Sequence, residues 1–369
     1  MYKILICGTE NNIDNIIKNL NIDTYVVGYT DIKRKMKLYN SFDGYPYQSL
    51  NNYQEVNYDF LVVTYDDNIY INEAREEFKS IEQRIIIYEW FKGATIANPV
   101  KKFIQSPIMF EQLILGMSHS ENAIQTQLMK RQTFKFSLPS MDLFCHYQVL
   151  KKLLEDVPEK MEKVKSIVFE LPYYIFNYDL SKSVRSAKKR LYYFRIFENY
   201  HNYGMNQEEI NVIGQFERYL KIFVYGNPNL KKNNSQECYC LNRSLKDILR
   251  LLLFQIKVLT ENNRVWKETR ELTVQENIQF LERILKLINQ RLPDVQITIL
   301  VCPFNPIFSI KNYKFIWKKR KDFYNILGQY NLTVLDTFLS VKNPFDFLDH
   351  CHLNPKAATK YTYLINEKL

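Results

Sequence analysis

Short apolar runs alternate with amphipathic stretches along the first part of the chain. Runs of strand length that are apolar almost throughout lie at 2–8, 24–31, 58–65 and 83–90. Stretches with apolar residues at helical spacing separate them, at 12–20 and 72–81. Strands that are apolar throughout and separated by helices are typical of a parallel sheet covered on both faces. The pattern therefore predicts a Rossmann-like α/β domain over residues 1–95.

The same alternation of apolar runs and amphipathic stretches returns after a connection at 96–110. This connection contains two prolines, Pro99 and Pro107. Apolar runs that predict strands lie at 113–115, 166–174, 295–306 and 332–338, and a helix is predicted near 316–329. A Tyr-rich middle part, about 185–290, has helical spacing and predicts a helical insertion. Residues 111–369 are thus expected to form a second α/β domain, with 96–110 as the linker.

The chain ends on a predicted helix that follows a loop of reactive side chains. Asn354 is a good N-cap, and Pro355 fits the first helical position because its missing N–H has no partner there in any case. Apolar residues then recur at helical spacing up to Ile365. The helix is therefore expected to hold the preceding loop, residues 349–352, in a fixed position.

Composition and charge narrow the function classes. With 369 residues, 46% of them hydrophobic, the chain is long enough for two domains with sizeable cores. The formal charge of +10 suits a polyanionic partner, either an anionic polymer or an anionic membrane surface. Basic runs occur at 183–195 and 317–321, but no nucleic-acid recognition motif accompanies them, so we expect no nucleic-acid partner. The sequence leaves the oligomeric state open.

The first residues of the chain and its cysteines indicate the cellular compartment. "MYKILICG" is a predicted strand and turn without the features of a secretion signal, and the longest apolar stretches are too short or too interrupted to span a bilayer. The six cysteines show no disulfide framework and are expected to be reduced thiols. These features predict a cytoplasmic protein that is able to lie at the inner face of the membrane.

The first predicted domain offers only part of a nucleotide-binding motif. The dinucleotide fingerprint needs several glycines, so that backbone approaches a pyrophosphate, but "CGTENNID" supplies only Gly8. Asp31 ends the second strand, where Rossmann proteins hold a ribose. A docking or scaffold domain is the favoured interpretation, with nucleotide binding through Gly8 and Asp31 as the alternative, and we expect no cofactor. Its "VVGYTD" strand and Gly44-Tyr45-Pro46 segment resemble the N-terminal Rossmann-like domain of bacterial sugar acyltransferases.

Candidate chemistry appears first in "LILGMSHSENAI", where a strand end is followed by a turn and a helix start. Gly116 permits a tight turn, and Ser118 comes at the junction. Backbone N–H groups at such a junction point outward and stabilise a developing oxyanion. Ser118 is therefore a candidate nucleophile, and a turn serine that caps the helix is the alternative. His119, next in the chain, either lines the cleft or faces solvent.

The second candidate is the loop before the last helix, with Asp349, His350, Cys351 and His352. Three interpretations are open: a metal site, a solvated turn, or a dyad in which Asp349 orients His352 as general base. Consecutive residues do not suit a tetrahedral ion, and Cys238-x-Cys240 is too tightly spaced, so no metal is expected. A serine needs a base to act as a nucleophile, which links this loop to Ser118.

The segments "LGMSHS" and "LDHCHLNPKAATKY" together resemble the nucleophile block and the Asp-x-x-His block of the SGNH (GDSL-like) hydrolase superfamily, over about residues 110–369. The resemblance is greatest to the branch that modifies surface polysaccharides. It implies a flavodoxin-like three-layer α/β/α fold and a serine esterase, deacylase or O-acyltransferase acting on an acylated glycan or its precursor. In that case Ser118 is the nucleophile, His352 the base and Asp349 its orienting partner.

The chain departs from the family pattern at the oxyanion hole. Met117 stands where the family has an aspartate, and no glycine or asparagine block is evident. The N–H of Ser140, in "SLPSMD", is one candidate donor, and Asn177 is a more distant one. The alternative function is therefore a catalytically degraded binding or scaffold protein in the biosynthesis of teichoic-acid-like surface polysaccharides.

Overall fold

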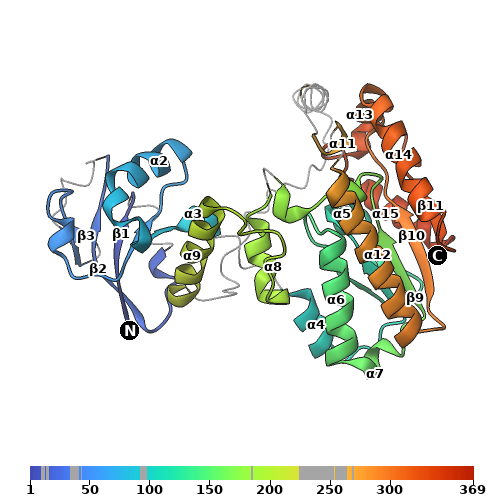
Figure 1. Ribbon diagram of the computed structural model, residues 1–369, viewed down its shortest axis with the longest axis horizontal. Coiled ribbons are helices and arrows are strands. Elements are labelled where there is room, and N and C mark those ends of the chain that lie inside the picture. The colour runs from blue at the N-terminus through green and yellow to red at the C-terminus, as the bar shows by residue number, and fades with distance from the viewer. Residues whose placement is uncertain are drawn as a thin grey trace. The chain divides into compact units, whose positions relative to one another are not determined.

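The computed structural model describes residues 1–9, 13, 16–33, 41–42, 44–91, 98–183, 186–223, 253, 264–267 and 270–369. They belong to two compact units. The first comprises Met1–Ala97 and Lys188–Ser235, and the second comprises Asn98–Ala187 and Gln236–Leu369. Each unit contains a parallel sheet with helices packed on it (Figure 1), which confirms the predicted α/β class.

The sheet of the first unit has four parallel strands in the order β2-β1-β5-β6. They are β1 (Tyr2–Cys7), β2 (Thr24–Thr30), β5 (Phe60–Val63) and β6 (Ile85–Ile87). Both faces are buried, because neighbouring residues such as Ile4 and Leu5 point to opposite sides and are both fully buried. All four predicted strands are present. A separate hairpin joins β3 (Ser41–Phe42) to β4 (Tyr45–Pro46).

Helices of the first unit come from two parts of the chain. They are α2 (Asn68–Glu77), α3 (Tyr88–Phe91), α8 (Lys189–Phe197) and α9 (Gln207–Ile222), with the 3-10 turns η2 (Tyr53–Glu55) and η3 (Lys79–Arg84). Ile71 and Ala74 of α2 pack against Leu5 and Leu61 of the sheet. Aromatic rings join α9 to α3: Phe91 and Phe216 lie 5.6 Å apart.

These contacts group α8 and α9 with the N-terminal sheet, whereas the sequence pattern places them in an insertion of the second domain. Helical periodicity reveals that a segment is amphipathic but not which sheet its apolar face covers. Most of the remaining predicted insertion, 224–263, falls outside the described residues.

The sheet of the second unit has five parallel strands in the order β11-β10-β9-β7-β8. They are β7 (Gln112–Leu115), β8 (Thr133–Lys135), β9 (Ser166–Glu170), β10 (Gln296–Val301) and β11 (Thr333–Asp336). In chain order this is the 2-1-3-4-5 arrangement of flavodoxin-like folds, in which ligands bind at the carboxyl ends of the strands. The sequence pattern missed β8, because three residues are too few to show a period.

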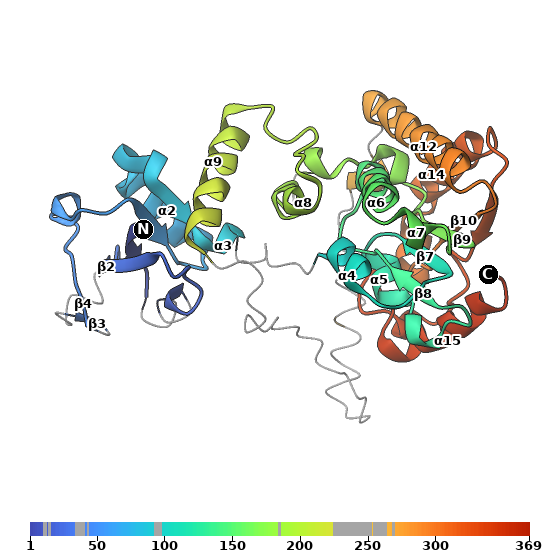
Figure 2. The ribbon, with the colours of Figure 1, turned by 90° about the horizontal axis from the view of Figure 1, so that it is seen from below.

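Helices cover both faces of this sheet. They are α4 (Pro99–Gln105), α5 (Ser118–Ala123), α6 (Leu143–Asp156), α7 (Pro158–Met161), α11 (Arg264–Lys267), α12 (Glu271–Arg291), α13 (Pro306–Lys311), α14 (Tyr313–Leu327) and α15 (Pro355–Asn366). The 3-10 turns are η4 (Thr126–Leu128), η5 (Ile175–Asn177), η6 (Leu180–Lys182) and η7 (Pro344–Asp346). Figure 2 shows α6 and α12 on one side of the sheet and α15 on the other, which makes three layers.

Alternation along β9 explains the two layers. Val168 packs in the cluster that contains Ala357 and Tyr361 of α15, whereas the next residue, Phe169, contacts the ring of His146 in α6. Within the predicted linker, Asn98 caps α4 by accepting the N–H of Lys101 at 3.1 Å, so part of that segment is helix. Every helix among the described residues falls short of the length or apolar character needed to cross a bilayer.

Candidate active site

The loop before α15 holds a hydrogen-bonded acid–histidine pair. Nδ1 of His352 lies 2.5 Å from Oδ2 of Asp349, and the other carboxylate oxygen accepts the backbone N–H groups of Cys351 and His352, both at 2.8 Å. The side chain of Asn354 caps α15 by accepting the N–H of Ala357 at 2.9 Å, as the sequence predicts. The loop is therefore held by the Asp349 carboxylate at its start and by the Asn354 cap at its end. With Nδ1 bound to the carboxylate, Nε2 is the nitrogen left to exchange a proton with a substrate.

The charge of Asp349 follows from its surroundings. Burial by itself raises the pKa of Asp349, but the hydrogen bond and positive charge of His352 outweigh it and hold that pKa well below its usual value. Asp349 is thus a carboxylate at neutral pH. A carboxylate is the form that accepts a proton-bearing Nδ1 and stabilises an imidazolium.

Ser118 is the first residue of α5, directly after the end of β7 and the turn at Gly116 and Met117. The turn needs glycine because of space: a Cβ on Gly116 would collide with the hydroxyl of Ser120 and lie 2.8 Å from Cβ of Glu170. Ser118 is partly exposed. Within the described part of the chain, its hydroxyl makes no hydrogen bond to another residue.

The packing of α5 against α15 brings the serine turn and the dyad loop to one edge of the sheet. Ala123 and Ile124 share a buried cluster with Leu353 and Ala358. The ring of His119, the residue after Ser118, lies 5.9 Å from the ring of His352. The structure therefore brings the two predicted segments together. No hydrogen bond links Ser118 to His352 in this structure; such bonds are often long before substrate binds.

A buried carboxylate that the sequence analysis missed lies beneath the serine turn. Glu170, the last residue of β9, is fully buried. It accepts hydrogen bonds from the backbone N–H of Met117 at 2.7 Å, from the hydroxyl of Ser120 at 3.2 Å and from Nδ1 of His119 at 3.1 Å. Three donors from one turn converge on one side chain. Glu170 thus fixes the shape of the turn that presents Ser118.

Full burial would raise the pKa of Glu170, yet the net shift is downward because His119 and the N–H of Met117 stabilise its charged form. A signal for this residue exists in the sequence. The strand "SIVFE" is apolar until its last residue, and a charge at the carboxyl end of a central parallel strand points into the place where ligands bind in such folds.

Aromatic side chains enclose His119 on its other side. The hydroxyl of Tyr174 lies 3.4 Å from Nε2 of His119, and the ring of Phe304 is 5.1 Å from the ring of His119. Trp266 packs on both Tyr174 and Phe304, at 5.0 and 5.4 Å. Burial, with Cys351 and Glu170 nearby, raises the pKa of Tyr174 well above its usual value, so it stays an O–H donor. Of its two predicted positions, His119 therefore takes the buried one, beside the dyad.

The two oxyanion candidates are placed differently. Residues after β8 run alongside the serine turn: the N–H of Leu138 donates to the carbonyl of Gly116 at 3.3 Å, and the hydroxyl of Ser137 bonds that of Ser120 at 2.8 Å. Ser140 follows with a left-handed φ of 67°. Asn177 is buried, and its side-chain oxygen accepts the N–H of Arg270 at 3.4 Å. Ser140 thus follows directly after a segment that bonds to the serine turn, whereas Asn177 is held towards the start of α12.

The residues considered for nucleotide binding have structural contacts in the first unit. A Cβ on Gly8 would collide with the hydroxyl of Thr64, so close strand packing explains that glycine. Asp31 is fully buried and accepts hydrogen bonds from the Tyr65 hydroxyl at 2.5 Å and the Lys33 N–H at 2.9 Å. These contacts account for both residues without a bound nucleotide.

Three potential metal ligands of the dyad loop lie closer together than their consecutive positions in the sequence suggest. Ligand atoms of Asp349, Cys351 and His352 all lie within 4.8 Å of one another. The loop curls, so that residues adjacent in the chain converge. An ion bound there would have to replace the hydrogen bond between Asp349 and His352, which already satisfies both groups. Cys238 and Cys240 lie outside the described residues.

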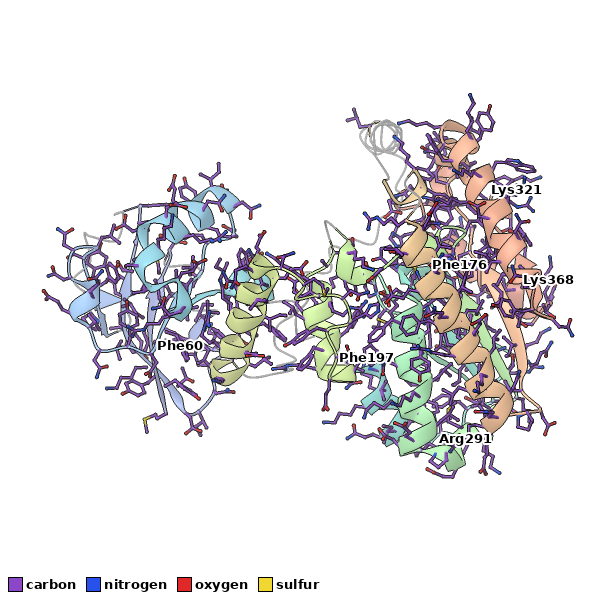
Figure 3. All side chains as sticks on the ribbon, in the orientation of Figure 1. Phe60, Phe176, Phe197, Arg291, Lys321 and Lys368 are labelled. Atoms are coloured by element: carbon purple, nitrogen blue, oxygen red, sulfur yellow. The ribbon has the colours of Figure 1, made fainter. Side chains whose placement is uncertain are left out.

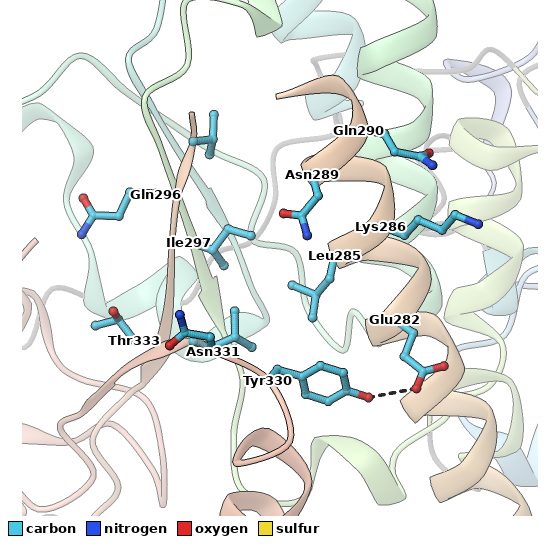
Figure 4. A pocket seen from close by; sticks show the side chains of 12 residues that line it. Glu282, Leu285, Lys286, Asn289, Gln290, Gln296, Ile297, Tyr330, Asn331 and Thr333 are labelled. Atoms are coloured by element: carbon cyan, nitrogen blue, oxygen red, sulfur yellow. Dashed lines mark hydrogen bonds between the residues drawn. The ribbon is translucent and has the colours of Figure 1, made fainter. Parts of the chain in front are cut away.

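A pocket of about 690 Å³ lies at the other edge of the second sheet. It is formed by the C-terminal half of α12 and the first residues of β10 and β11, and is bridged by a hydrogen bond of 3.1 Å from Tyr330 to Glu282 (Figure 4). Because the strands are parallel, this amino edge is the opposite edge from that of Ser118 and His352. The pocket is not part of the candidate active site.

Among known proteins, similar chains were found only in the comparison with solved structures. The chain matches no protein-family model, and no curated protein matches it. Among solved structures, one similar chain is provisionally described as a platelet activating factor from Streptococcus pneumonia, with a TM-score of 0.36, 11% identity, and coverage of 81% of this chain and 100% of that chain. A second is the lipase Lip_vut3 from goat rumen metagenome, with a TM-score of 0.30, 13% identity, and coverage of 69% and 95%.

Proposed function

We propose that the second unit is a serine esterase, deacylase or O-acyltransferase of the SGNH type. Ser118 is the nucleophile, His352 the general base and Asp349 the residue that orients it. The observation that carries the proposal is the Asp349–His352 hydrogen bond on a loop whose histidine ring lies 5.9 Å from that of His119, next to Ser118.

The reaction follows from these positions. Oγ of Ser118 attacks the ester carbonyl carbon while its proton passes to Nε2 of His352, and Asp349 stabilises the resulting imidazolium. The alcohol leaves with that proton. Water or a sugar hydroxyl then gives a proton to His352 and attacks the acyl-enzyme, which releases the acid or the transferred ester and frees Ser118.

The oxyanion requires donors other than the Met117 N–H, because Glu170 already accepts that group at 2.7 Å. The N–H of Ser118 and that of Ser140 are the proposed donors, since residues 137–138 bond to the serine turn. The proposed substrate, an acylated surface glycan or its precursor, is supported by the sequence resemblance.

The proposal is tested with a fluorophosphonate probe, which modifies only an activated serine, and with p-nitrophenyl acetate. Labelling and hydrolysis are expected in the native protein and expected to vanish in Ser118→Ala. Ser183 is the residue that ends η6, and it lies outside the serine turn and the dyad loop. Ser183→Ala is therefore a serine control that should leave both labelling and hydrolysis unchanged. Labelling that persists in Ser118→Ala would remove Ser118 from the mechanism.

The alternative is a binding or scaffold protein that keeps the fold without catalysis. Two observations favour it: the Ser118 hydroxyl has no hydrogen bond to His352 among the described residues, and the Met117 N–H is occupied by Glu170. On this alternative the native protein is inert to the fluorophosphonate probe. Titration with an acylated glycan should then show binding without release of acid.

A further inference from the structure

The outer face of α13 and α14 exposes large apolar side chains. Ile310 is 74% exposed, Tyr313 61% and Trp317 65%. On a helix, residues four apart share a face, so Tyr313 and Trp317 lie side by side on α14. The inner face of the same helix carries the buried residues Ile316 and Phe323. The exposed residues thus form a patch that the core of the unit does not use.

Lysines surround this apolar patch. Lys311, Lys314, Lys318 and Lys321 are all exposed, and Figure 3 shows Lys321 on the outer side of α14. Lys314 and Lys318 share one row of the helix, next to the row of Tyr313 and Trp317. From 295 to 321 the sequence contains no Asp or Glu, and Asp322 is the first acidic residue that follows. The patch therefore carries a net positive charge around an aromatic and aliphatic centre.

The patch begins beside the candidate active site. The N–H of Asn305, the N-cap of α13, donates to the carbonyl of His350 at 2.9 Å, and the ring of Phe308 lies 5.0 Å from that of His350. His350 lies next to Cys351 and two residues from His352. The helix that presents Ile310 is thus anchored on the dyad loop.

We propose that this face, defined by Ile310, Tyr313, Trp317 and the four lysines, binds the surface of an anionic membrane. Trp and Tyr are the side chains that favour the interface between headgroups and acyl chains, and lysines beside them are attracted to anionic lipids. A nucleic acid or soluble polyanion would use the lysines but would gain nothing from a largely exposed isoleucine. Binding in this orientation brings the dyad loop near the lipid headgroups, where a membrane-associated ester is within reach.

Vesicle co-sedimentation tests the proposal on the chain of residues 1–369. Vesicles of phosphatidylcholine mixed with phosphatidylglycerol should bind the protein, and vesicles of phosphatidylcholine alone should bind it much more weakly. Lys314→Gln/Lys318→Gln should weaken binding to the anionic vesicles by roughly 25-fold, at about fivefold for each lysine removed. Trp317→Ala should weaken it by about tenfold through loss of buried apolar area.

Matched controls come from elsewhere in the same unit. Lys163→Gln/Lys286→Gln removes the same charge from exposed positions outside the patch, and Tyr363→Ala removes an aromatic ring that is 56% exposed on α15. Both should bind anionic vesicles like the native protein. Labelling of Ser118 by the fluorophosphonate probe should be unchanged in every variant.

Three results would overturn the proposal. The first is that the protein does not bind the anionic vesicles. The second is that the patch variants and the control variants lose equal affinity for these vesicles. The third is that Trp317→Ala binds the vesicles like the native protein while soluble polyphosphate displaces the protein from them completely. The last result would assign the lysines to a soluble polyanion instead. Vesicle binding is measured without turnover, so its failure leaves the Ser118 proposal intact, and a failure of labelling leaves the membrane proposal intact.

Discussion

Glu170 and His119 form a buried hydrogen-bonded pair one residue away from the proposed nucleophile: Oε1 of Glu170 lies 3.1 Å from Nδ1 of His119. The same carboxylate accepts the N–H of Met117 and the hydroxyl of Ser120. One strand end therefore determines the conformation of the whole serine turn. It is also a place where removing a single charge leaves several donors unsatisfied.

Glu170→Gln should lower the free energy of unfolding by about 3 kcal/mol, the usual cost of breaking a buried pair from one side. An amide has one acceptor oxygen for three donors, and its own N–H groups face those donors. Urea denaturation measures the change. The control is Glu111→Gln, which removes an ion pair of 2.7 Å with Lys165 that is largely exposed, and should leave stability nearly unchanged. Equal effects of the two substitutions would contradict a structural role for Glu170.

Asp349→Asn should reduce the rate of fluorophosphonate labelling or ester hydrolysis, by a factor on the order of 10⁴. Asn presents either an amide N–H to Nδ1 of His352 or only a neutral acceptor, so the imidazole is held in the wrong tautomer or loses its stabilising charge. Asp346→Asn, in the nearby turn η7, is the matched control. If Asp349→Asn keeps its thermal midpoint and its rate, the dyad has no catalytic part.

Gly116→Ala should be destabilising by about 2 kcal/mol, because the new methyl group meets Ser120 and Glu170 in a packed turn. Gly214→Ala in α9 is the opposite case: its Cβ would have only Arg218 nearby, at 3.4 Å, and Ala is a better helix former by about 1 kcal/mol. Thermal unfolding measures both changes: the melting temperature should fall in Gly116→Ala and rise in Gly214→Ala. A stabilised Gly116→Ala would contradict the crowding of this turn by Ser120 and Glu170.

The burial of His146 should make the stability of the protein depend on pH. It is fully buried, and burial lowers its pKa to about 4 from an ordinary value near 6.5. Between these values the unfolded chain binds a proton that the folded chain does not, so stability falls as the pH drops from 6.5 to 4. The lowered pKa values of Asp349 and Glu170 act below this window, where carboxylates begin to protonate.

His146→Leu should remove that part of the pH dependence and, at pH 7, leave stability equal or higher. Both ring nitrogens are buried and lack a hydrogen-bond partner among the described residues, so the change removes two unsatisfied polar atoms. His146→Gln, which cannot titrate but keeps polar atoms in the core, should remove the pH dependence without the gain. Denaturation at pH 5 and pH 7 separates them; an unchanged difference between the two pH values in His146→Leu would show that another group titrates.

The elements that were predictable share one property: their signal is local. The apolar run at 24–31 is a strand at Thr24–Thr30, and Asn354 with Pro355 begins α15 as expected. Ser118, Asp349 and His352 could be named because their types and spacing match a motif. That they reach one edge of the sheet depends on α5 packing against α15, which is a contact between distant segments.

What the sequence did not reveal depends on such distant contacts. Glu170 has meaning only because β9 lies next to β7 in the sheet, so that its side chain reaches the turn after β7. Similarly, α8 and α9 contact residues of α3 that lie far away in the sequence: Tyr192 of α8, for example, donates to the carbonyl of Trp90 at 2.9 Å. Periodicity cannot identify a partner a hundred residues away.

The strand order has a consequence for biosynthesis. β7 occupies an interior position, and the face that carries Ile114 is covered by α15, which is synthesised more than two hundred residues after β7. At normal rates of translation, that apolar face waits on the order of ten seconds or more for its cover. Until α15 is made, the nascent chain therefore exposes the apolar side chains of β7, and this surface is a natural target for a holding chaperone.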